Sequence, residues 1–489
     1  MATFVLVAYG LTLAGLAYFG LHRVKMLWLY ARQARRASAP PLAWAGPLPS
    51  VCVQCPLYNE PLVVEALLER VTRLRWEGPL EIQVLDDSTD ETPAIIEAWL
   101  RRHPDHAHRV SHVRRERRTG YKAGALGYGM ERSAAAFFAI FDADFRPEPD
   151  FLEQLMPHFS DPRVGVVQAR WEFSNRRASL LTRFQGIFLD AHFVVEQVAR
   201  SAAGLFFNFN GTAGIWRRTA LEDAGSWTPD TVTEDLDASY RAQRRGWRFV
   251  YLKDYTVASE LPENLTAFKS QQHRWTKGGV QVARKQLGEI LAGPLPARIK
   301  LEAFSHLTVG FVHPLLVTFS LLFVPALYVM GQAPQHWVWG FLNPLSVIVT
   351  TGSTVVLYIS GQYFSQREWR EGVLLFFASP VLLAFGLAMS VTCCIAVAEG
   401  LWTRGGEFVR TPKGGRGVRT GGLLTPLRGR ALFSTVIALE LVFGGMMLAG
   451  ALYFGSREMV AVACTLVLQA AGFLGLAALS THDLIPRAG

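Results

Sequence analysis

Apolar residues are distributed unevenly along the 489-residue chain, and their pattern changes beyond its middle. Between about residues 48 and 290, short apolar runs such as VCVQCPL and LEIQVLD alternate with stretches of helical periodicity such as VVEALLERVTRL and TPAIIEAWLRR. Strands that alternate with helices of about 10 to 15 residues are typical of a parallel α/β sheet. The pattern therefore predicts an α/β domain over residues 48–290.

A long apolar run precedes this domain. Residues 2–21 are twenty uncharged residues, close to the length that crosses about 30 Å of hydrocarbon as a helix. Basic residues follow the run instead of preceding it, unlike the basic start of a secretory signal. We therefore expect an uncleaved transmembrane anchor over residues 1–30, with its N-terminus outside and the α/β domain in the cytoplasm.

Five more apolar runs follow, at 303–330, 337–359, 372–398, 431–455 and 459–480. If the first three all crossed a membrane, the basic segment 403–430 would lie outside, against the positive-inside rule. We expect the run 372–398, which contains Pro380, to enter without crossing or to lie along the interface. Residues 297–489 are thus predicted to be transmembrane and interfacial helices, with the loop 403–420 in the cytoplasm.

Composition and charge agree with a membrane protein. Half of the residues are apolar, 18% are charged and the net charge is +9, which suits a cytoplasmic membrane face or an anionic substrate. No zinc-ligand array or aromatic-rich RNA motif is present, so we expect no nucleic-acid partner. Cys52 and Cys55 form a C-x-x-C without a second pair, and we interpret them as buried small residues of a strand.

Two strand-like runs end in acidic pairs, Asp86 with Asp87 and Asp142 with Asp144. Ligands of open parallel sheets bind beyond the carboxyl ends of the strands, so both pairs should converge on one crevice. Such carboxylates suit a divalent cation that carries a diphosphate. The alternative interpretation is that these aspartates only cap turns after the strands.

Two later segments carry candidate chemistry. In TEDLDAS, Glu234 and Asp235 begin a predicted helix. Acidic residues are favourable in the first turn of any helix, so these two could be structural. A general base at a helix start beside a crevice would show the same sequence pattern. In QQHRWTKGG, Arg274 could bind phosphate oxygens and Trp275 could stack on a sugar ring. The alternative for that segment is an amphipathic surface helix at the membrane.

The motifs PLYNEP, VLDDS, YKAGAL, FDADF, FNGTAG, TED and QQHRW, in this order and before membrane spans, resemble the membrane-embedded family 2 glycosyltransferases. That group includes the cellulose, hyaluronan and chitin synthases. Segments such as GYKAGALGYGM, VQARWEF, FFNFNGTAGIWR and QQHRWTKGG look most like those of the plant cellulose-synthase-like mannan synthases. The resemblance is strong over about residues 50–290 and weaker beyond, and it implies a GT-A (Rossmann-like) glycosyltransferase domain.

The resemblance also implies roles for donor-binding residues. Tyr58 and Glu60, with an aspartate of the Asp86 and Asp87 pair, would hold the nucleotide base and ribose. Lys122 would sit near the donor diphosphate. Asp142 and Asp144 would bind the sugar diphosphate together with Mg²⁺ or Mn²⁺.

The acceptor side follows from the same resemblance. Asp235 would be the catalytic base, with Glu234 a weaker candidate. Gln271, Arg274 and Trp275 would form the edge where donor diphosphate meets acceptor, with Trp275 stacking on the terminal sugar. One base facing a leaving diphosphate implies inversion, so an α-linked donor gives a β-linkage.

A loop of cellulose synthases with the pattern F-x-V-T-x-K closes over the donor. Phe408, Thr411 and Lys413 match it here, with Arg410 in place of the valine. We interpret the segment as a gating loop with glycine hinges. The alternative is a basic juxtamembrane loop that contacts anionic lipid.

Three hypotheses compete. A processive synthase of a β-linked glucan or mannan, threading its product through the membrane, is favoured by the loop and the downstream spans. Non-processive glycosylation of a lipid such as ceramide or diacylglycerol is the alternative, and a channel with an inactive nucleotide-binding domain is disfavoured because all acidic positions are present. The wider family favours UDP-glucose slightly as donor, with GDP-mannose next.

The first hypothesis sets partners and location. A glycan acceptor and the lipid membrane are expected partners, and an accessory export protein stays open. The expected location is the inner or plasma membrane, as a multi-pass protein with a cytoplasmic catalytic domain. Glu440 in an apolar run could line a sugar pathway or be paired between helices. His306 and His313 are expected to be packing or interface residues.

Overall fold

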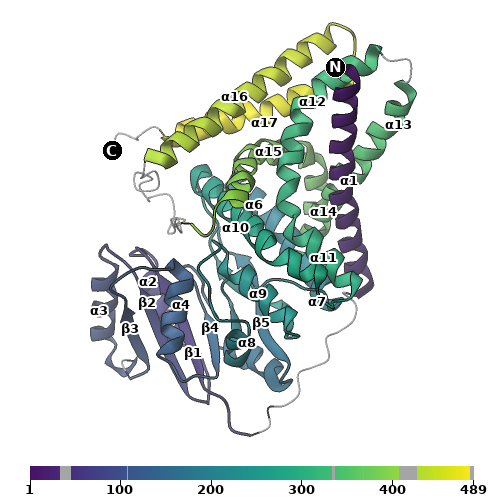
Figure 1. Ribbon diagram of the computed structural model, residues 1–489. Helices are drawn as coiled ribbons and strands as arrows, with labels where there is room; N and C mark the ends of the chain where they lie inside the picture. The colour runs from purple at the N-terminus through teal and green to yellow at the C-terminus, as the bar shows by residue number, and fades with distance from the viewer. Residues whose placement is uncertain are drawn as a thin grey trace.

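The computed structural model describes residues 1–33, 44, 46–106, 108–332, 336–366, 368–406 and 427–484. A twisted sheet with short helices lies at one end of the molecule, and long helices lie at the other (Figure 1). The sheet is built from seven strands in the order β3-β2-β1-β4-β6-β5-β7. The strands are β1 (Val51–Leu57), β2 (Leu80–Asp86), β3 (Val110–Arg114), β4 (Phe137–Ile140), β5 (Val164–Phe173), β6 (Gly214–Arg217) and β7 (Arg248–Ser259).

The sheet is largely parallel, as the alternating pattern predicts. Strands β1 to β4 run parallel to one another, β5 is parallel to β7, and β6 is antiparallel to both β4 and β5. The chain fills the sheet outward from β1 to β3 and then returns to place β4 on the other side of β1. Such a reversal opens a crevice beyond the carboxyl ends of β1 and β4.

Short helices cover both faces of the sheet. Its inner strands are therefore buried on both sides, which explains why they are almost wholly apolar. One face packs on a cluster that includes Leu67, Trp99 and Phe151, and the other on a cluster that includes Leu126 and Trp216. Cys52 and Cys55 are buried in β1, as expected. The covering helices are α2 (Val64–Val71), α3 (Thr92–Arg102), η1 (Pro104–His106), α4 (Tyr121–Glu131), α5 (Phe151–Leu155), η2 (Met156–Ser160), α8 (Arg218–Asp223) and α9 (Glu234–Arg244).

A second group of helices connects the sheet to the long apolar helices. It begins with a continuous helix over residues 180–202, in which one π-helical turn, η3 (Ala191–Glu196), interrupts the α-helical pattern between α6 (Leu180–Asp190) and α7 (Gln197–Ala202). It continues after β7 with α10 (Leu265–Ala292), α11 (Ala297–Leu307) and the short η4 (Val309–Phe311). The side chain of Asn264 caps α10 by accepting from the N–H of Ala267 at 2.7 Å.

Six helical segments of the described chain are long and apolar enough to cross a membrane: 2–32, 309–332, 339–366, 369–402, 433–455 and 460–483. All five apolar runs read from the sequence are helical, although the first divides between α11 and α12. The helices are α1 (Ala2–Gln33), α12 (Val312–Gln332), α13 (His336–Val347), η5 (Ile348–Gly352), α14 (Ser353–Gln366), α15 (Trp369–Trp402), α16 (Leu427–Gly455) and α17 (Val460–Leu484).

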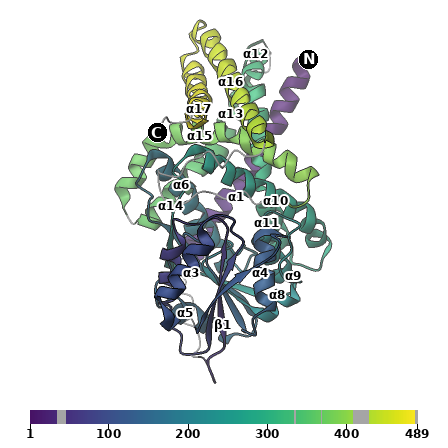
Figure 2. The same cartoon turned by 90° about the vertical axis from the view of Figure 1, so that its left-hand side faces the viewer.

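Helix α15 differs from the other long helices. Its most apolar window is 61% buried, whereas the corresponding share of the other five is 39% or less. It lies along α10: Glu399 pairs with Lys277 of that helix at 3.0 Å, and a side chain at Gly400 would meet the Lys277 carbonyl at 2.8 Å. Figure 2 shows α15 running crosswise below α12, α16 and α17. The interfacial placement expected for the run 372–398 stays a prediction.

Candidate active site

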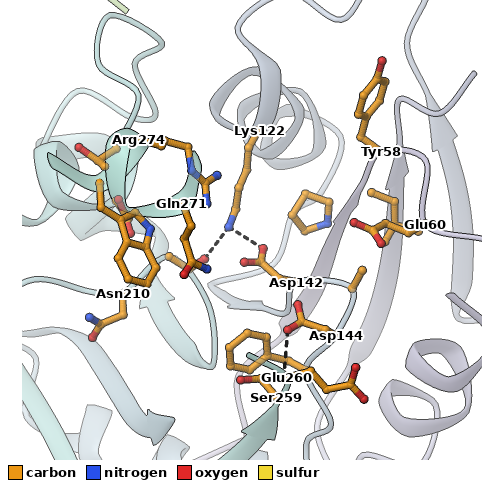
Figure 3. A pocket seen from close by; sticks show the side chains of 18 of the residues that line it. Tyr58, Glu60, Lys122, Asp142, Asp144, Asn210, Ser259, Glu260, Gln271 and Arg274 are labelled. Carbon is orange, nitrogen blue, oxygen red and sulfur yellow. Dashed lines mark hydrogen bonds and ion pairs between the residues drawn. The ribbon is translucent and has the colours of Figure 1, made fainter. Parts of the chain in front are cut away.

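A cavity lies beyond the carboxyl ends of β1 and β4, at the reversal of strand order (Figure 3). Its walls come from the residues that follow these two strands, from the first turns of α4 and α9, and from α10. The structure brings eleven residues singled out in the sequence to this one cavity: Tyr58, Glu60, Asp87, Lys122, Asp142, Asp144, Glu234, Asp235, Gln271, Arg274 and Trp275.

Lys122 and Asp142 form the centre of the cavity. The Lys122 ammonium donates to Asp142 Oδ1 at 2.5 Å and to the Gly211 carbonyl at 3.0 Å. Burial alone would lower the pKa of Lys122, but Asp142 and Glu234 outweigh it, and the net pKa is raised. The ammonium therefore stays charged at neutral pH, as an anion-binding group must.

Asp144 lies beside Asp142, because β4 ends at Ile140 and the chain then turns. Asp144 is 6% exposed and accepts from the N–H of Glu260 at 3.4 Å. In the described parts of the chain no group of three His, Cys, Asp or Glu residues could hold a metal ion. Two adjacent carboxylates still fit Mg²⁺ or Mn²⁺, because such an ion usually takes one or two carboxylates and completes its shell with phosphate oxygens and water.

The structure separates the two aspartates of LDDS. Asp87 lines the cavity, and its carboxylate is held by Arg115, whose Nε donates at 2.9 Å. Asp86 lies outside the cavity lining: it accepts from the N–H of Ser88 at 2.9 Å and contacts His112 Nε2 at 2.9 Å. These hydrogen bonds outweigh the effect of burial and lower the pKa of Asp86. Of the pair, Asp87 lines the cavity and Asp86 stabilises the turn after β2.

Tyr58 and Glu60 stand at the far end of the cavity from Asn210 and Gln271 (Figure 3). The guanidinium of Arg118 lies 3.3 Å from the centroid of the Tyr58 ring. Sequence reasoning did not single out Arg118, since its stretch RRERRT shows only a general basic charge. A cation against an aromatic face at this end suits a flat base next to a diphosphate.

Glu234 and Asp235 are the first residues of α9 and enter the cavity together. Asp235 accepts from the N–H of Leu236 at 2.8 Å through Oδ1. Burial and the neighbouring Glu234 raise the pKa of Asp235 to about 7, and burial also raises the pKa of Glu234. A carboxylate with its pKa near neutrality is suited to accept a proton in a reaction. Asp237, in the same first turn of α9, lies outside the cavity lining and pairs with Arg241 at 2.8 Å.

The raised pKa of Asp235 predicts the pH dependence of the reaction. A base acts only when deprotonated, so kcat/KM should rise with pH up to about 7 and level off above it. In Glu234→Gln the neighbouring negative charge is lost, so the midpoint should move to lower pH. Initial rates of both proteins between about pH 5 and 9 test this. A flat wild-type profile across that range would contradict the assignment.

Gly211 brings the chain close to Asp235. Its φ is +83°, and a Cβ at this position would lie 2.9 Å from Asp235 Oδ2. Only glycine fits such a position without strain and without displacing the carboxylate. The FNGTAG motif thus places Gly211, whose carbonyl accepts from Lys122, directly against the carboxylate of Asp235.

We expect Gly211→Ala to lower turnover about tenfold or more by displacing the Asp235 carboxylate. Gly204→Ala is the matched control, because Gly204 also has a positive φ, +61°, but has nothing within 4 Å of the added methyl. Both variants should lose about 1 kcal/mol of stability from the backbone alone. Equal turnover in the two variants, measured alongside thermal unfolding, would show that the close approach is irrelevant to catalysis.

Helix α10 forms the remaining wall with Gln271, Arg274 and Trp275. Burial lowers the pKa of Arg274, and the carboxylates of Glu234 and Asp142 oppose this effect. Arg274 thus belongs to the same charged group as the acids across the cavity. His273, in the same motif, turns toward α15 and lies 3.6 Å from Glu399.

Glu440 of α16 is paired between helices. Its Oε1 accepts from Lys269 Nζ of α10 at 2.6 Å, and the same ammonium donates to Ser480 of α17 at 2.8 Å. Of the two readings left open for Glu440, pairing is the one observed. Asp483 adds a contact to the N-terminus of α10, accepting from the N–H of Leu265 at 3.1 Å. These bonds tie the hairpin of α16 and α17 to the helix that carries the QQHRW motif.

The proposed gating residues Phe408, Thr411 and Lys413 lie outside the described residues. The residues just before them lie against the cavity wall: the N–H of Gly405 donates to the Asp230 carbonyl at 2.7 Å, and Gln281 Nε2 donates to the Gly405 carbonyl at 2.8 Å. Val232, two residues from Asp230, is part of the cavity lining.

Several lining residues did not stand out in the sequence. Asn210 lies next to Gly211, and Trp171 and Phe173 come from the end of β5. Both groups fall in segments that carry the family resemblance, FNGTAG and VQARWEF, and that resemblance was the only available signal. Glu260, which follows β7, had no such signal in the sequence. Apolar and aromatic lining next to charged groups suits a sugar, which has apolar faces and polar edges.

Comparisons with known proteins agree with this geometry. Residues 49–278 match the family model described as "Glycosyltransferase like family 2". A probable glucomannan 4-beta-mannosyltransferase of Arabidopsis thaliana is 45% identical over 255 residues, which are 50% of this chain and 46% of the relative. One of Oryza sativa subsp. japonica is 47% identical over 249 residues, 50% of this chain and 45% of the relative.

Among solved structures, a mannosyltransferase from Pyrobaculum calidifontis in complex with GDP-Man and Mn²⁺ covers 82% of this chain and 99% of its own. The TM-score is 0.54 and the identity 21%, so this likeness supports the GT-A fold. The chain spans about half the length of the plant relatives it matches. The slight preference for UDP-glucose drawn from the wider family finds no support in these matches.

Proposed function

We propose that this chain, whose residues 49–278 form a family 2 glycosyltransferase domain, transfers mannose from GDP-mannose to the end of a growing β-1,4-linked glycan. One observation carries the proposal. Asp235, with its pKa raised to about 7, shares a cavity with the anion-binding Lys122 and the carboxylates of Asp142 and Asp144. The names of the plant relatives support mannose as the sugar and β-1,4 as the linkage.

Different lining residues would bind the nucleoside, the diphosphate and the acceptor. Tyr58, Glu60 and Asp87 would hold the nucleoside, while Lys122 and Arg274 contact the diphosphate. Trp275 offers an indole face to the acceptor's terminal sugar, as the family resemblance implies. The acceptor hydroxyl is thereby held beside Asp235, with the diphosphate at the opposite side.

Asp235 takes the proton from the acceptor hydroxyl as its oxygen attacks the anomeric carbon of mannose. The bond from this carbon to the diphosphate breaks on the opposite face, so an α-linked donor gives a β-linked product. Lys122 and Arg274 stay charged beside the departing diphosphate and stabilise it. A Mg²⁺ or Mn²⁺ ion bound by Asp142 and Asp144 would neutralise the charge that develops on the leaving group.

We place the glycosyltransferase domain on the cytoplasmic side of a membrane. The N-terminus, the turn between α16 and α17 and the C-terminal end of α12 all lie at the end of the molecule away from the sheet (Figures 1 and 2). With α15 interfacial, α1, α12, the segment 339–366, α16 and α17 cross, and residues 403–406 after α15 stay on the domain's side. That arrangement obeys the positive-inside rule.

The nature of the product tests this proposal. Purified protein in lipid nanodiscs would be incubated with radiolabelled GDP-mannose, Mn²⁺ and short β-1,4-linked oligosaccharides, and the products sized. We expect a ladder of products longer than the acceptor by one or more sugars. Label found only in the lipid extract would instead support the glycosylation of a membrane lipid. Asp235→Asn, treated in the same way, controls for contaminating transferases.

A further inference from the structure

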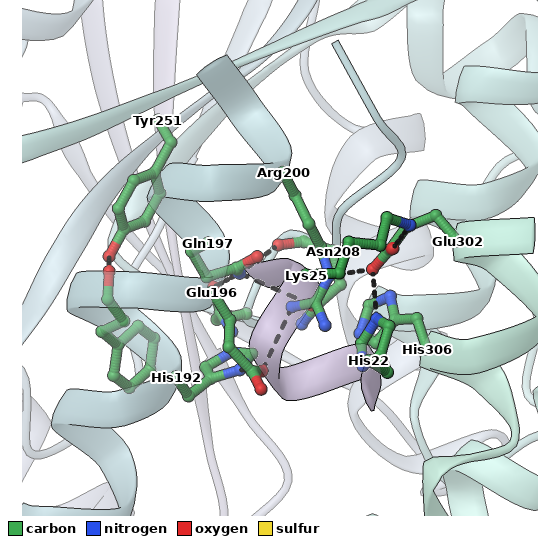
Figure 4. Close-up of polar contacts among 12 residues, drawn as sticks. His22, Lys25, His192, Glu196, Gln197, Arg200, Asn208, Tyr251, Glu302 and His306 are labelled. Carbon is green, nitrogen blue, oxygen red and sulfur yellow. Dashed lines mark hydrogen bonds and ion pairs between the residues drawn. The ribbon is translucent and has the colours of Figure 1, made fainter. Parts of the chain in front are cut away.

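A chain of polar and charged side chains, buried at Arg200 and Glu302 and partly exposed elsewhere, runs from the N-terminal helix to His192 (Figure 4). Its five members, here called the anchor array, come from α1, η3, α7 and α11. They are Lys25, Glu302, Arg200, Glu196 and His192.

Glu302 of α11 is the hub of the anchor array. Its side chain has no exposed surface and accepts from Lys25 Nζ at 2.6 Å and from Arg200 Nε at 3.0 Å. His22, also on α1, contacts the same carboxylate through Nε2 at 3.0 Å. The hydrogen bonds and positive charges around Glu302 outweigh its burial and hold its pKa well below the usual range. Two residues of the N-terminal helix are thus bound to α11 through one carboxylate, which also contacts Arg200 of α7.

The array continues toward the cavity. Arg200 Nη1 lies 3.3 Å from Glu196 Oε2, and the same oxygen lies 3.4 Å from His192 Nδ1. The other ring nitrogen of His192, Nε2, lies 3.4 Å from Asn210 Nδ2. Since Glu196 is an ionised acceptor, Nδ1 of His192 carries the proton and Nε2 accepts from the Asn210 amide. Each contact therefore fixes the orientation of the next side chain.

Asn210 is the point where the array reaches the cavity. Its Oδ1 accepts from Gln197 Nε2 at 3.0 Å, so its amide is held from both sides. Nδ2 carries two N–H groups, and only the contact with His192 is found for it among the described residues. Asn210 lines the cavity next to Gly211, which abuts Asp235, and it lies with Gln271 at the end away from Tyr58 (Figure 3). This is the end that the proposed function gives to the acceptor.

The architecture of the array argues for a positioning role. Burying several charges costs free energy that apolar residues of the same volume would not cost, so such groups are weak evidence of stability and can instead specify a geometry. The π-helical turn η3 carries both His192 and Glu196, and such turns occur often at functional sites.

We propose that the anchor array holds Asn210 in the orientation that binds a hydroxyl of the acceptor sugar, so that the N-terminal helix is part of the acceptor site. Asn210 contacts the acceptor, and the five array members are positioning residues. The inference rests on the proposed function, because it requires a glycan acceptor at this end of the cavity.

The test compares acceptor and donor kinetics in the full-length protein in nanodiscs. His192→Ala should raise the KM for a β-1,4-linked oligosaccharide about three- to tenfold, because it removes one support of the Asn210 amide. The KM for the donor should stay unchanged. His192→Gln, whose amide oxygen can accept from Asn210, should restore much of the loss. Combined with Asn210→Ala, His192→Ala should have little further effect.

Lys25→Met extends the test to the N-terminal helix. The Lys25 side chain is 32% exposed, so this variant remains informative if His192→Ala fails to fold. It should raise the acceptor KM about twofold or more. Arg32→Met on the same helix and His158→Ala in the glycosyltransferase domain, both outside the array and the cavity, are matched controls and should leave it unchanged.

Two outcomes would be decisive against the inference. If the variants lower the melting temperature but leave the acceptor KM at the wild-type value, the array is structural only. If donor and acceptor KM rise equally, the array does not act through Asn210. Failure of the wild-type protein to extend any acceptor would contradict the proposed function instead, so the two failures are distinguishable.

Discussion

Turnover in Asp235→Asn should fall by about a thousandfold or more, with donor binding retained. Asparagine has the shape of aspartate, and its amide oxygen can still accept from the Leu236 N–H. What it loses is the ability to take a proton from the acceptor hydroxyl. General base catalysis contributes about 10²- to 10⁴-fold, and Asp235 is well placed for it because its pKa is raised to about 7. Steady-state rates and titration of GDP-mannose binding would measure the two quantities separately.

Glu234→Gln separates the two acids at the start of α9. Glu234 lies in the same cavity, but the family resemblance makes it the weaker candidate. We expect Glu234→Gln to keep measurable turnover with a shifted pH profile, whereas Asp235→Asn has almost none at any pH. The reverse result, with Asp235→Asn active and Glu234→Gln inactive, would exchange their roles.

Loss of the second carboxylate of the D-x-D motif should be nearly as severe. We expect Asp144→Asn to lower turnover by about a hundredfold or more, because one of two candidate ligands for a metal ion becomes neutral. The variant keeps an oxygen that can accept from the Glu260 N–H, so its fold should be preserved. Donor affinity measured with and without Mn²⁺ should differ in the wild type and be nearly the same in Asp144→Asn.

Asp150→Asn is the matched control for Asp144→Asn. Asp150 is a nearby aspartate whose Oδ1 accepts from the Tyr255 hydroxyl at 2.8 Å, and it lies outside the cavity lining. Its substitution should leave turnover and the effect of Mn²⁺ unchanged. If chelation of divalent cations leaves wild-type turnover intact, the metal-binding role of both Asp142 and Asp144 is wrong.

The sequence predicted the cavity well where a residue's place follows from strand order. Asp87 and Asp142 follow parallel strands of one sheet, and both line the cavity, as the expected convergence of the two acidic pairs requires. The same reasoning could not separate Asp86 from Asp87, because consecutive residues at a strand end point in opposite directions. The side chains around each aspartate decide which of the two faces the cavity. Here His112 on the neighbouring strand β3 contacts the Asp86 carboxylate.

Contacts between segments that are distant in the sequence could not be predicted from it. Glu440 is 171 positions from Lys269, and no local pattern reveals that they meet. Lys25 is 277 positions from Glu302, and as a basic residue after an apolar run it suggested only membrane orientation. Likewise, no sequence pattern predicts that Asn210 contacts His192 and Gln197. Long-range pairing of polar side chains depends on how helices pack, which periodicity does not specify.

The identity of the donor and of the linkage tests the central claim most directly. Purified protein would be given GDP-mannose, UDP-glucose and UDP-N-acetylglucosamine in separate reactions, each with the label in the sugar, and the products digested with a β-1,4-specific endomannanase. We predict transfer chiefly from GDP-mannose into a product that this enzyme degrades. Incorporation from a UDP-sugar but not from GDP-mannose, or a mannose product that resists digestion, would contradict the account.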